Sequence, residues 1–270
     1  MRGEQDNMDR HSDPFYAAKL TFGTIHEEIR SLKLISDDFR RQQNVQPFIE
    51  KDKATGELIC KARVLRDVPD DIERSATRYL TEIRSTLDKA VNASARILGS
   101  VSLKHTNFPF GDKTGGRNAF EKQLMRETGI WRGIPKELRT YLMSLQPYPR
   151  SAAYEGGNDL LALLGELSNP AKHDSRLFVS LDVEGFIIKK FSGKFHFPHV
   201  GVIWNESRDE CQLCRISSAA GSIQFEVPSQ ISFSNSMGYF DRDFSELLGE
   251  MAKLAEQIVG EIEALTLTVR

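Results

Sequence analysis

Residues that could carry out chemistry gather in one short segment of the chain. Asn169, Lys172 and His173 follow a leucine-rich helical pattern and precede a region of strand-like alternation. Asn169 is a good helix N-cap and Pro170 suits the first helical position, so a short helix is expected to begin here. Its first turn would place a cation and an imidazole beside unsatisfied backbone N–H groups. The cation and the N–H groups could hold an anion, and the imidazole could move a proton.

A second charged pair lies on an earlier, longer helical pattern. Arg84 and Asp88 are four residues apart and flank its apolar stripe. If the leucine-rich helix packs on this seam, the pair lies near the Asn169 segment. Arg84 and Lys172 would then clamp a phosphate, and His173 would act as general acid and base. Asp88 and Asn169 would orient these groups. The matching chemistry is metal-independent cleavage of a phosphodiester, which needs no cofactor.

The same residues also fit a structural interpretation. Arg84 and Asp88 would form an ion pair at a helix edge, and the segment from Asn169 to His173 would be a capped turn that locks the helices to the strands. The protein would then be a non-catalytic interaction module that binds a protein partner or a second copy of itself. The residue pattern leaves both interpretations open.

A weaker candidate is a zinc site. His196 and His199 form one pair of ligand types with two residues between them, and Cys211 and Cys214 form another. The cysteines lie in a strand-like run, where positions 211 and 214 are expected to point to opposite faces. Burial of both cysteines as small hydrophobic residues is therefore the competing interpretation.

Composition excludes several classes of protein. Lys and Arg number 36 against 38 Asp and Glu, so the net charge of −2 provides no global attraction to nucleic acid or to an anionic membrane. Basic residues do gather locally, and a basic surface for a nucleic-acid backbone is one interpretation of them: Lys104, Lys113, Arg117, Lys122, Arg126 and Arg132. No apolar run approaches the roughly 18 residues of a membrane span. Three cysteines are too few for a disulfide framework, which favours a cytoplasmic protein.

The periodicity predicts an α+β fold in a single domain over residues 14–270, after a disordered tail at 1–13. Apolar residues recur at helical spacing in four long stretches that would form a bundle: residues 14–43, 69–99, 157–168 and 242–265. Two strand-like runs around residues 53–56 predict an N-terminal β-hairpin. Five further runs predict an antiparallel β unit inserted at 177–228.

Three segments together resemble an uncharacterised family of bacterial proteins. They run from Ile83 to Val91, from Thr106 to Phe110 and from Leu164 to His173. The shared motifs are an Arg-Ser-x-Leu-Asp helix, a Phe-Pro clip and a Leu-Ser-Asn-x-x-Lys-His segment. The resemblance implies a bacterial, cytoplasmic protein and brings no known activity.

A more distant resemblance is to HEPN domains, helical bundles that often act as metal-independent ribonucleases in toxin and defence systems. Their motif consists of Arg, a polar residue, a short gap and a His at a helix start. Asn169 and His173 match the polar residue and the His, whereas Ser168 stands in the place of Arg. The resemblance implies an RNA substrate, with Arg84 supplying the cation from another helix.

Overall fold

The protein has an α+β fold with antiparallel strand pairing. The computed structural model describes residues 13–100, 103–111, 116–150, 156–169, 178–183, 185–192, 196–217, 222–234 and 242–270. The predicted tail at 1–13 lies outside these residues except for Asp13. Within the described ranges, no helix is long and apolar enough to cross a membrane.

The chain divides into two compact units, each built from separate stretches of sequence. The helical unit comprises Met1–Ser31, Arg74–Leu177 and Ser245–Arg270. The sheet unit comprises Leu32–Glu73 and Phe178–Phe244. The long helices α2 (Tyr16–Arg41) and α3 (Asp70–Ile97) each contribute residues to both units.

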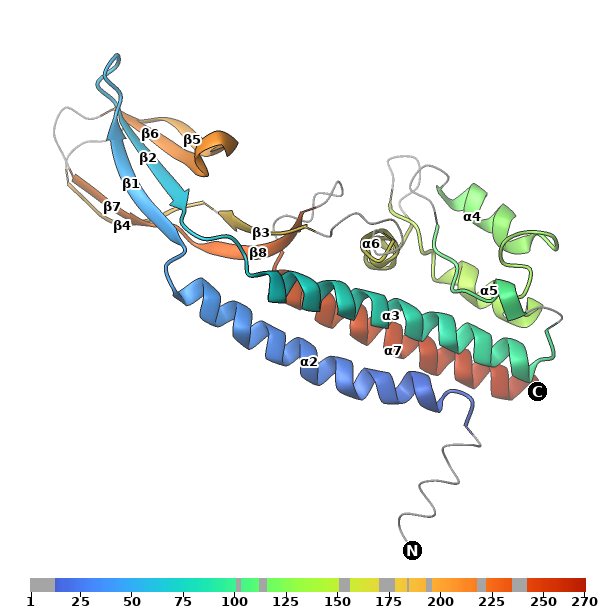
Figure 1. Ribbon diagram of the computed structural model, residues 1–270. Coiled ribbons are helices and arrows are strands. Elements are labelled where there is room, and N and C mark those ends of the chain that lie inside the picture. The colour runs from blue at the N-terminus through green and yellow to red at the C-terminus, as the bar shows by residue number, and fades with distance from the viewer. Residues whose placement is uncertain are drawn as a thin grey trace, which may run out of the picture. The chain divides into compact units, whose positions relative to one another are not determined.

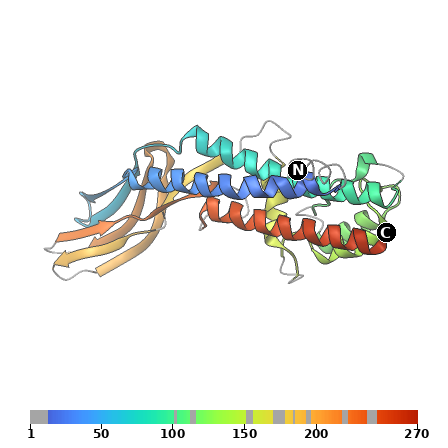
Figure 2. The same cartoon turned by 90° about the horizontal axis from the view of Figure 1, so that it is seen from below.

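The four long helical patterns are confirmed. The helices are α2, α3, α6 (Asp159–Leu167) and α7 (Phe244–Val269). Within the helical unit, α2, α3 and α7 lie side by side (Figures 1 and 2). Two shorter helices, α4 (Gly116–Met125) and α5 (Lys136–Ser144), complete this unit together with the 3-10 turn Leu103–His105.

An apolar stripe explains why α3 packs against its neighbours. Every third or fourth side chain is at most 5% exposed: Ala76, Tyr79, Leu80, Ile83, Leu87 and Val91. The facing side of α7 is equally apolar, with Leu248, Met251 and Ile258 buried. Ser94 and Thr266 share a buried hydroxyl hydrogen bond of 2.6 Å, which joins α3 to α7 and leaves neither polar group unsatisfied.

Helix α6 is buried on most of its faces, as its composition predicts. Four of its five leucines, at 161, 163, 164 and 167, are at most 3% exposed, and Leu160 is half-buried. Asn158 caps the helix by accepting a 3.1 Å hydrogen bond from the backbone N–H of Leu161. Figure 1 looks down the axis of α6 while α3 runs across the view, so the two helices cross steeply.

Antiparallel strands build the sheet unit. One sheet has the order β1 (Val45–Lys51), β2 (Leu58–Val64), β6 (Glu210–Ser217) and β5 (His196–Asn205). Two further pairs are β3 (Phe178–Val183) with β8 (Ser229–Ser234), and β4 (Ile187–Ser192) with β7 (Ser222–Glu226). The predicted hairpin is confirmed as β1 and β2. It joins the later strands through the pairing of β2 with β6, and the β unit extends past residue 228 to include β8.

A β-bulge corrects the expected orientation of the cysteines on β6. Cys60 pairs with Cys214 and Ala62 pairs with Cys211, so β6 has one residue more than β2 between these partners. Cys60 and Ala62 are two apart and share a face of β2. Their partners therefore share that face too, and all four side chains are buried in one apolar cluster.

A carboxyl group between β3 and β8 gives the sheet unit a testable pH dependence. Burial raises the pKa of Asp182, and the hydrogen bond donated by the Ser232 hydroxyl only partly offsets this. A carboxyl whose pKa is higher in the folded state contributes stability below its unfolded pKa and loses it as the pH rises through the folded value. The Asp182→Asn side chain does not titrate. As the pH rises from the unfolded pKa of Asp182 through its folded pKa, this variant should therefore gain stability relative to the wild type. Thermal melts across the acidic range test this, and a pH-independent difference would contradict it.

Candidate functional site

One face of α3 carries three polar residues at intervals of four. Arg84, Asp88 and Asn92 lie one above another on the helix surface. Asp88 Oδ1 accepts a 2.7 Å hydrogen bond from the backbone N–H of Phe108, and Asn92 Nδ2 donates at 2.8 Å to the hydroxyl of Thr106. This face therefore holds the 103–111 segment against α3. Asn92 is not among the predicted site residues, although the four-residue repeat gave a signal for it.

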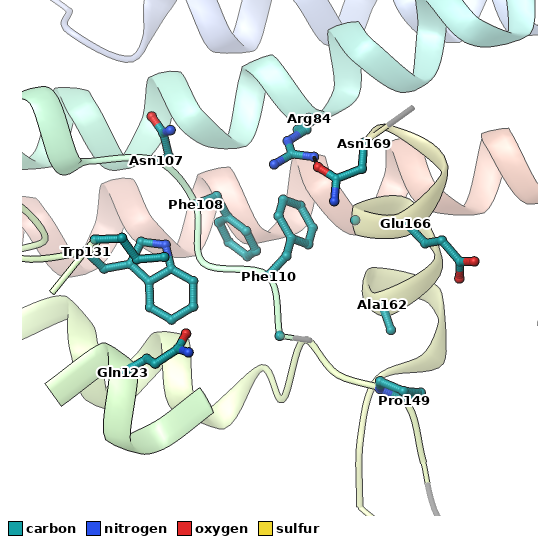
Figure 3. Close-up of a pocket in the computed structure, with 13 residues that line it drawn as sticks. Arg84, Asn107, Phe108, Phe110, Gln123, Trp131, Pro149, Ala162, Glu166 and Asn169 are labelled. Atoms are coloured by element: carbon teal, nitrogen blue, oxygen red, sulfur yellow. Dashed lines mark hydrogen bonds between the residues drawn. The ribbon is translucent and has the colours of Figure 1, made fainter. Parts of the chain in front are cut away.

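Arg84 joins α3 to the end of α6. Its Nη1 donates 3.1 Å hydrogen bonds to Ser168 Oγ and to Asn169 Oδ1. The guanidinium carbon lies 5.0 Å from the centroid of the Phe110 ring, in cation–π geometry. Ser168 Oγ in turn donates to the carbonyl of Leu164 at 2.6 Å, which fixes the hydroxyl that Arg84 contacts. Figure 3 shows Arg84 and Asn169 together beside Phe110.

The structure thus brings together two of the five predicted catalytic residues, Arg84 and Asn169. Asp88 lies one turn along α3, close enough for its carboxylate to raise the pKa of Arg84, and its Oδ1 holds the Phe108 backbone. Lys172 and His173 lie outside the described residues, as does the short helix expected to begin at Pro170.

The Arg84 guanidinium borders a cavity of about 580 Å³. Its walls include aromatic rings, amides, one carboxylate and the backbone of α6: Arg84, Asn107, Phe108, Phe110, Gly111, Gln123, Ile130, Trp131, Pro149, Ala162, Gly165, Glu166 and Asn169. Phe110 approaches α6 closely at Gly165, because a Cβ atom on this glycine would lie 2.7 Å from Cδ1 of Phe110. The missing side chain leaves room for Phe110 against α6.

The charge of Arg84 is not balanced by an ion pair within the described part of the chain. Burial lowers the pKa of its guanidinium, and the nearby Asp88 carboxylate raises it by less. Its Nε is buried and has no hydrogen-bond acceptor among the same residues. A guanidinium offers five N–H donors, and the contacts with Ser168 and Asn169 use Nη1 alone. The cavity wall therefore carries a desolvated cation with donors to spare, which favours an anion.

The cysteines of the weak zinc-site candidate, Cys211 and Cys214, are buried in the apolar core. Cys60 donates a hydrogen bond to Cys214, which raises the pKa of Cys60 and lowers that of Cys214. Burial raises the pKa of the Cys211 thiol to about 11, which keeps it protonated and a poor zinc ligand. No three His, Cys, Asp or Glu side chains form a metal-binding group among the residues described. The side chains of His196 and His199 lie outside them.

Comparisons with protein-family models, curated proteins and solved structures found no match to this chain. The chemistry of the cavity therefore has to be inferred from its side chains. A guanidinium binds phosphate through paired N–H donors, aromatic rings stack on nucleobases, and amides hydrogen-bond to base edges. All three groups are present, so the walls suit a nucleotide better than an uncharged, apolar ligand.

Proposed function

We propose that the protein binds RNA at this cavity and cleaves it as a HEPN-like, metal-independent endoribonuclease of the toxin or defence type. The observation that carries the proposal is the 3.1 Å bond between Arg84 Nη1 and Ser168 Oγ. Ser168 occupies the place of the Arg in the HEPN motif. The Arg84 guanidinium, which comes from α3, contacts this serine, and this contact supports a role for Arg84 in place of the arginine of the motif.

Each residue then has a distinct part in cleavage. Arg84 and Lys172 hold the phosphate and stabilise the negative charge that develops on its oxygens. His173 takes the proton from the ribose 2′-hydroxyl, whose oxygen attacks phosphorus and forms a cyclic phosphodiester. The bond from phosphorus to the 5′ oxygen breaks, and protonated His173 gives its proton to that oxygen. Asn169 fixes the position of Arg84 through its Oδ1. Burial lowers the pKa of Arg84 and the Asp88 carboxylate opposes this, while Asp88 Oδ1 holds the 103–111 segment in place.

Cleavage of a pool of labelled RNAs in EDTA tests the proposal. The wild type should cleave, and His173→Ala should cleave about 10²- to 10⁴-fold more slowly, because general acid–base catalysis contributes that much. His26→Ala is the matched control, since His26 lies on α2 and its ring contacts Glu256 on α7. The control should cleave like the wild type. Absence of cleavage by the wild type, or undiminished cleavage by a folded His173→Ala protein, would refute the proposal.

A second candidate is a non-catalytic interaction module in which the same residues are structural. The 2.7 Å bond of Asp88 to the Phe108 backbone favours it, because it commits a predicted site residue to holding a loop. Under this alternative no RNA is cleaved, and His173→Ala lowers the melting temperature. Loss of a buried hydrogen-bond partner costs about 1–3 kcal/mol.

A further inference from the structure

A second, smaller cavity of the helical unit adjoins the cavity beside Arg84. The smaller cavity has a volume of about 240 Å³ and is lined by Arg126 and Arg132, among others. Gln123 and Ile130 line both cavities. The two cavities are therefore neighbours, and together they form a hollow between the polar face of α3 and the segment after α4.

Cations stand at both ends of this hollow. Arg126 and Arg132 are exposed and form no ion pair with any residue that the structure describes. Arg117 differs from these two arginines because it forms an ion pair, with its Nε 2.7 Å from Oε1 of Glu121. Separate cations along a groove, each lacking a fixed counterion, suit a ligand whose negative charges repeat.

Aromatic rings and amides lie between the two charged ends. The Phe110 ring is half-buried, and Trp131 on the other side of the cavity is 7% exposed (Figure 3). The amide side chains of Asn107 and Gln123 are exposed at the rim. A ring face stacks on any nucleobase, whereas a base inside a duplex presents no free face. The middle of the hollow therefore selects an unpaired base.

From these observations, and resting on the proposed RNA function, we propose that the substrate is a single-stranded segment of RNA. One unpaired base enters the cavity beside Phe110. The phosphate on one side of it contacts Arg84, and phosphates on the other side contact Arg126 and Arg132.

We call this course of the strand, from Arg84 past Phe110 to Arg126 and Arg132, the single-strand path. The path is tested by measuring how salt weakens the binding of a short 2′-O-methylated RNA oligonucleotide, which lacks the nucleophile for cleavage. Binding to single strands weakens with salt at a slope of about 0.7 per phosphate contact on logarithmic axes. Arg126→Gln combined with Arg132→Gln should lower the slope by about 1.4, while Arg117→Gln should leave it unchanged. An oligonucleotide with abasic sites should bind about tenfold more weakly at equal slope, because stacking is lost and the charges are not.

The outcomes separate this inference from the proposed function. One possible result is that Arg84→Gln weakens binding, while the wild type binds duplex RNA, abasic single strands and intact single strands equally well. The single-strand path would then be wrong, and the RNA site at Arg84 would still be supported. An unchanged slope in the Arg126 and Arg132 double variant would also overturn the path. If the wild type binds no RNA at low salt, both proposals fail.

Discussion

Replacing Leu164 by Ala should destabilise the helical unit by about 2–5 kcal/mol, the usual cost of emptying a buried leucine site. Leu164 is 1% exposed on α6. The structure around a buried leucine generally relaxes only in part when the side chain is removed. The carbonyl of Leu164 also accepts the Ser168 hydroxyl that Arg84 contacts, so any shift of this turn reaches the site. Urea denaturation of the two proteins measures the loss.

Leu267→Ala on α7 is the matched control, because Leu267 is 56% exposed. Surface replacements of this kind usually change stability by no more than about 0.5 kcal/mol. Equal effects of the two variants would mean that α6 is not packed as described. They would also remove the basis for placing Asn169 beside Arg84.

Gly165→Ala should destabilise the protein by about 1–3 kcal/mol, although Ala is normally the better helix residue by about 1 kcal/mol. The new Cβ would lie 2.7 Å from Cδ1 and 2.9 Å from Cγ of Phe110, too close for either atom to remain in place. Phe110 would be pushed from beneath Arg84, and the cavity would lose its stacking face. Weaker RNA binding should accompany the lower melting temperature.

Gly260→Ala on α7 makes the same substitution in open space. No atom lies within 4 Å of its ideal Cβ position, so this variant should be more stable by about 0.5–1 kcal/mol. If Gly165→Ala lowers the stability and Gly260→Ala raises it, the crowding at Phe110 accounts for the difference. A stabilised Gly165→Ala protein would contradict the close approach of Phe110 to α6.

The helices could be predicted from the sequence because their signals are local. The stripe of α3 repeats every three or four residues, and its acidic first turn at Asp70, Asp71 and Glu73 marks the start. The leucines of α6 leave few polar positions, which predicts burial without any knowledge of the partner. These patterns reached the observed ends within a few residues.

Pairings between distant strands could not be predicted in this way. Nothing in the local pattern of β2 indicates that it pairs with β6, about 150 residues later in the sequence. The bulge on β6 could not be predicted from the sequence either. One additional residue moves the side chains that follow it to the other face of the strand, but it hardly changes the alternation of apolar and polar residues. Strand β8 did carry a signal, because Ile231 and Phe233 alternate with serines and both are buried.

The candidate site was predictable in part. Helical spacing placed Arg84 at the edge of the α3 stripe, and the motif around Asn169 indicated chemistry. Their 3.1 Å contact depends on how α6 crosses α3, which no periodicity specifies. The aromatic walls were missed for the same reason, because Phe110 and Trp131 reach the cavity from separate segments.

The position of α7 in the helical unit affects the order in which the protein can form on the ribosome. Helices α2 and α3 are made early, yet the buried partner of Ser94 is Thr266, close to the end of the sequence. At translation rates of about 5–20 residues per second, the apolar stripe of α3 waits on the order of ten seconds for its partner helix. During synthesis, that stripe is a natural place for a chaperone to bind.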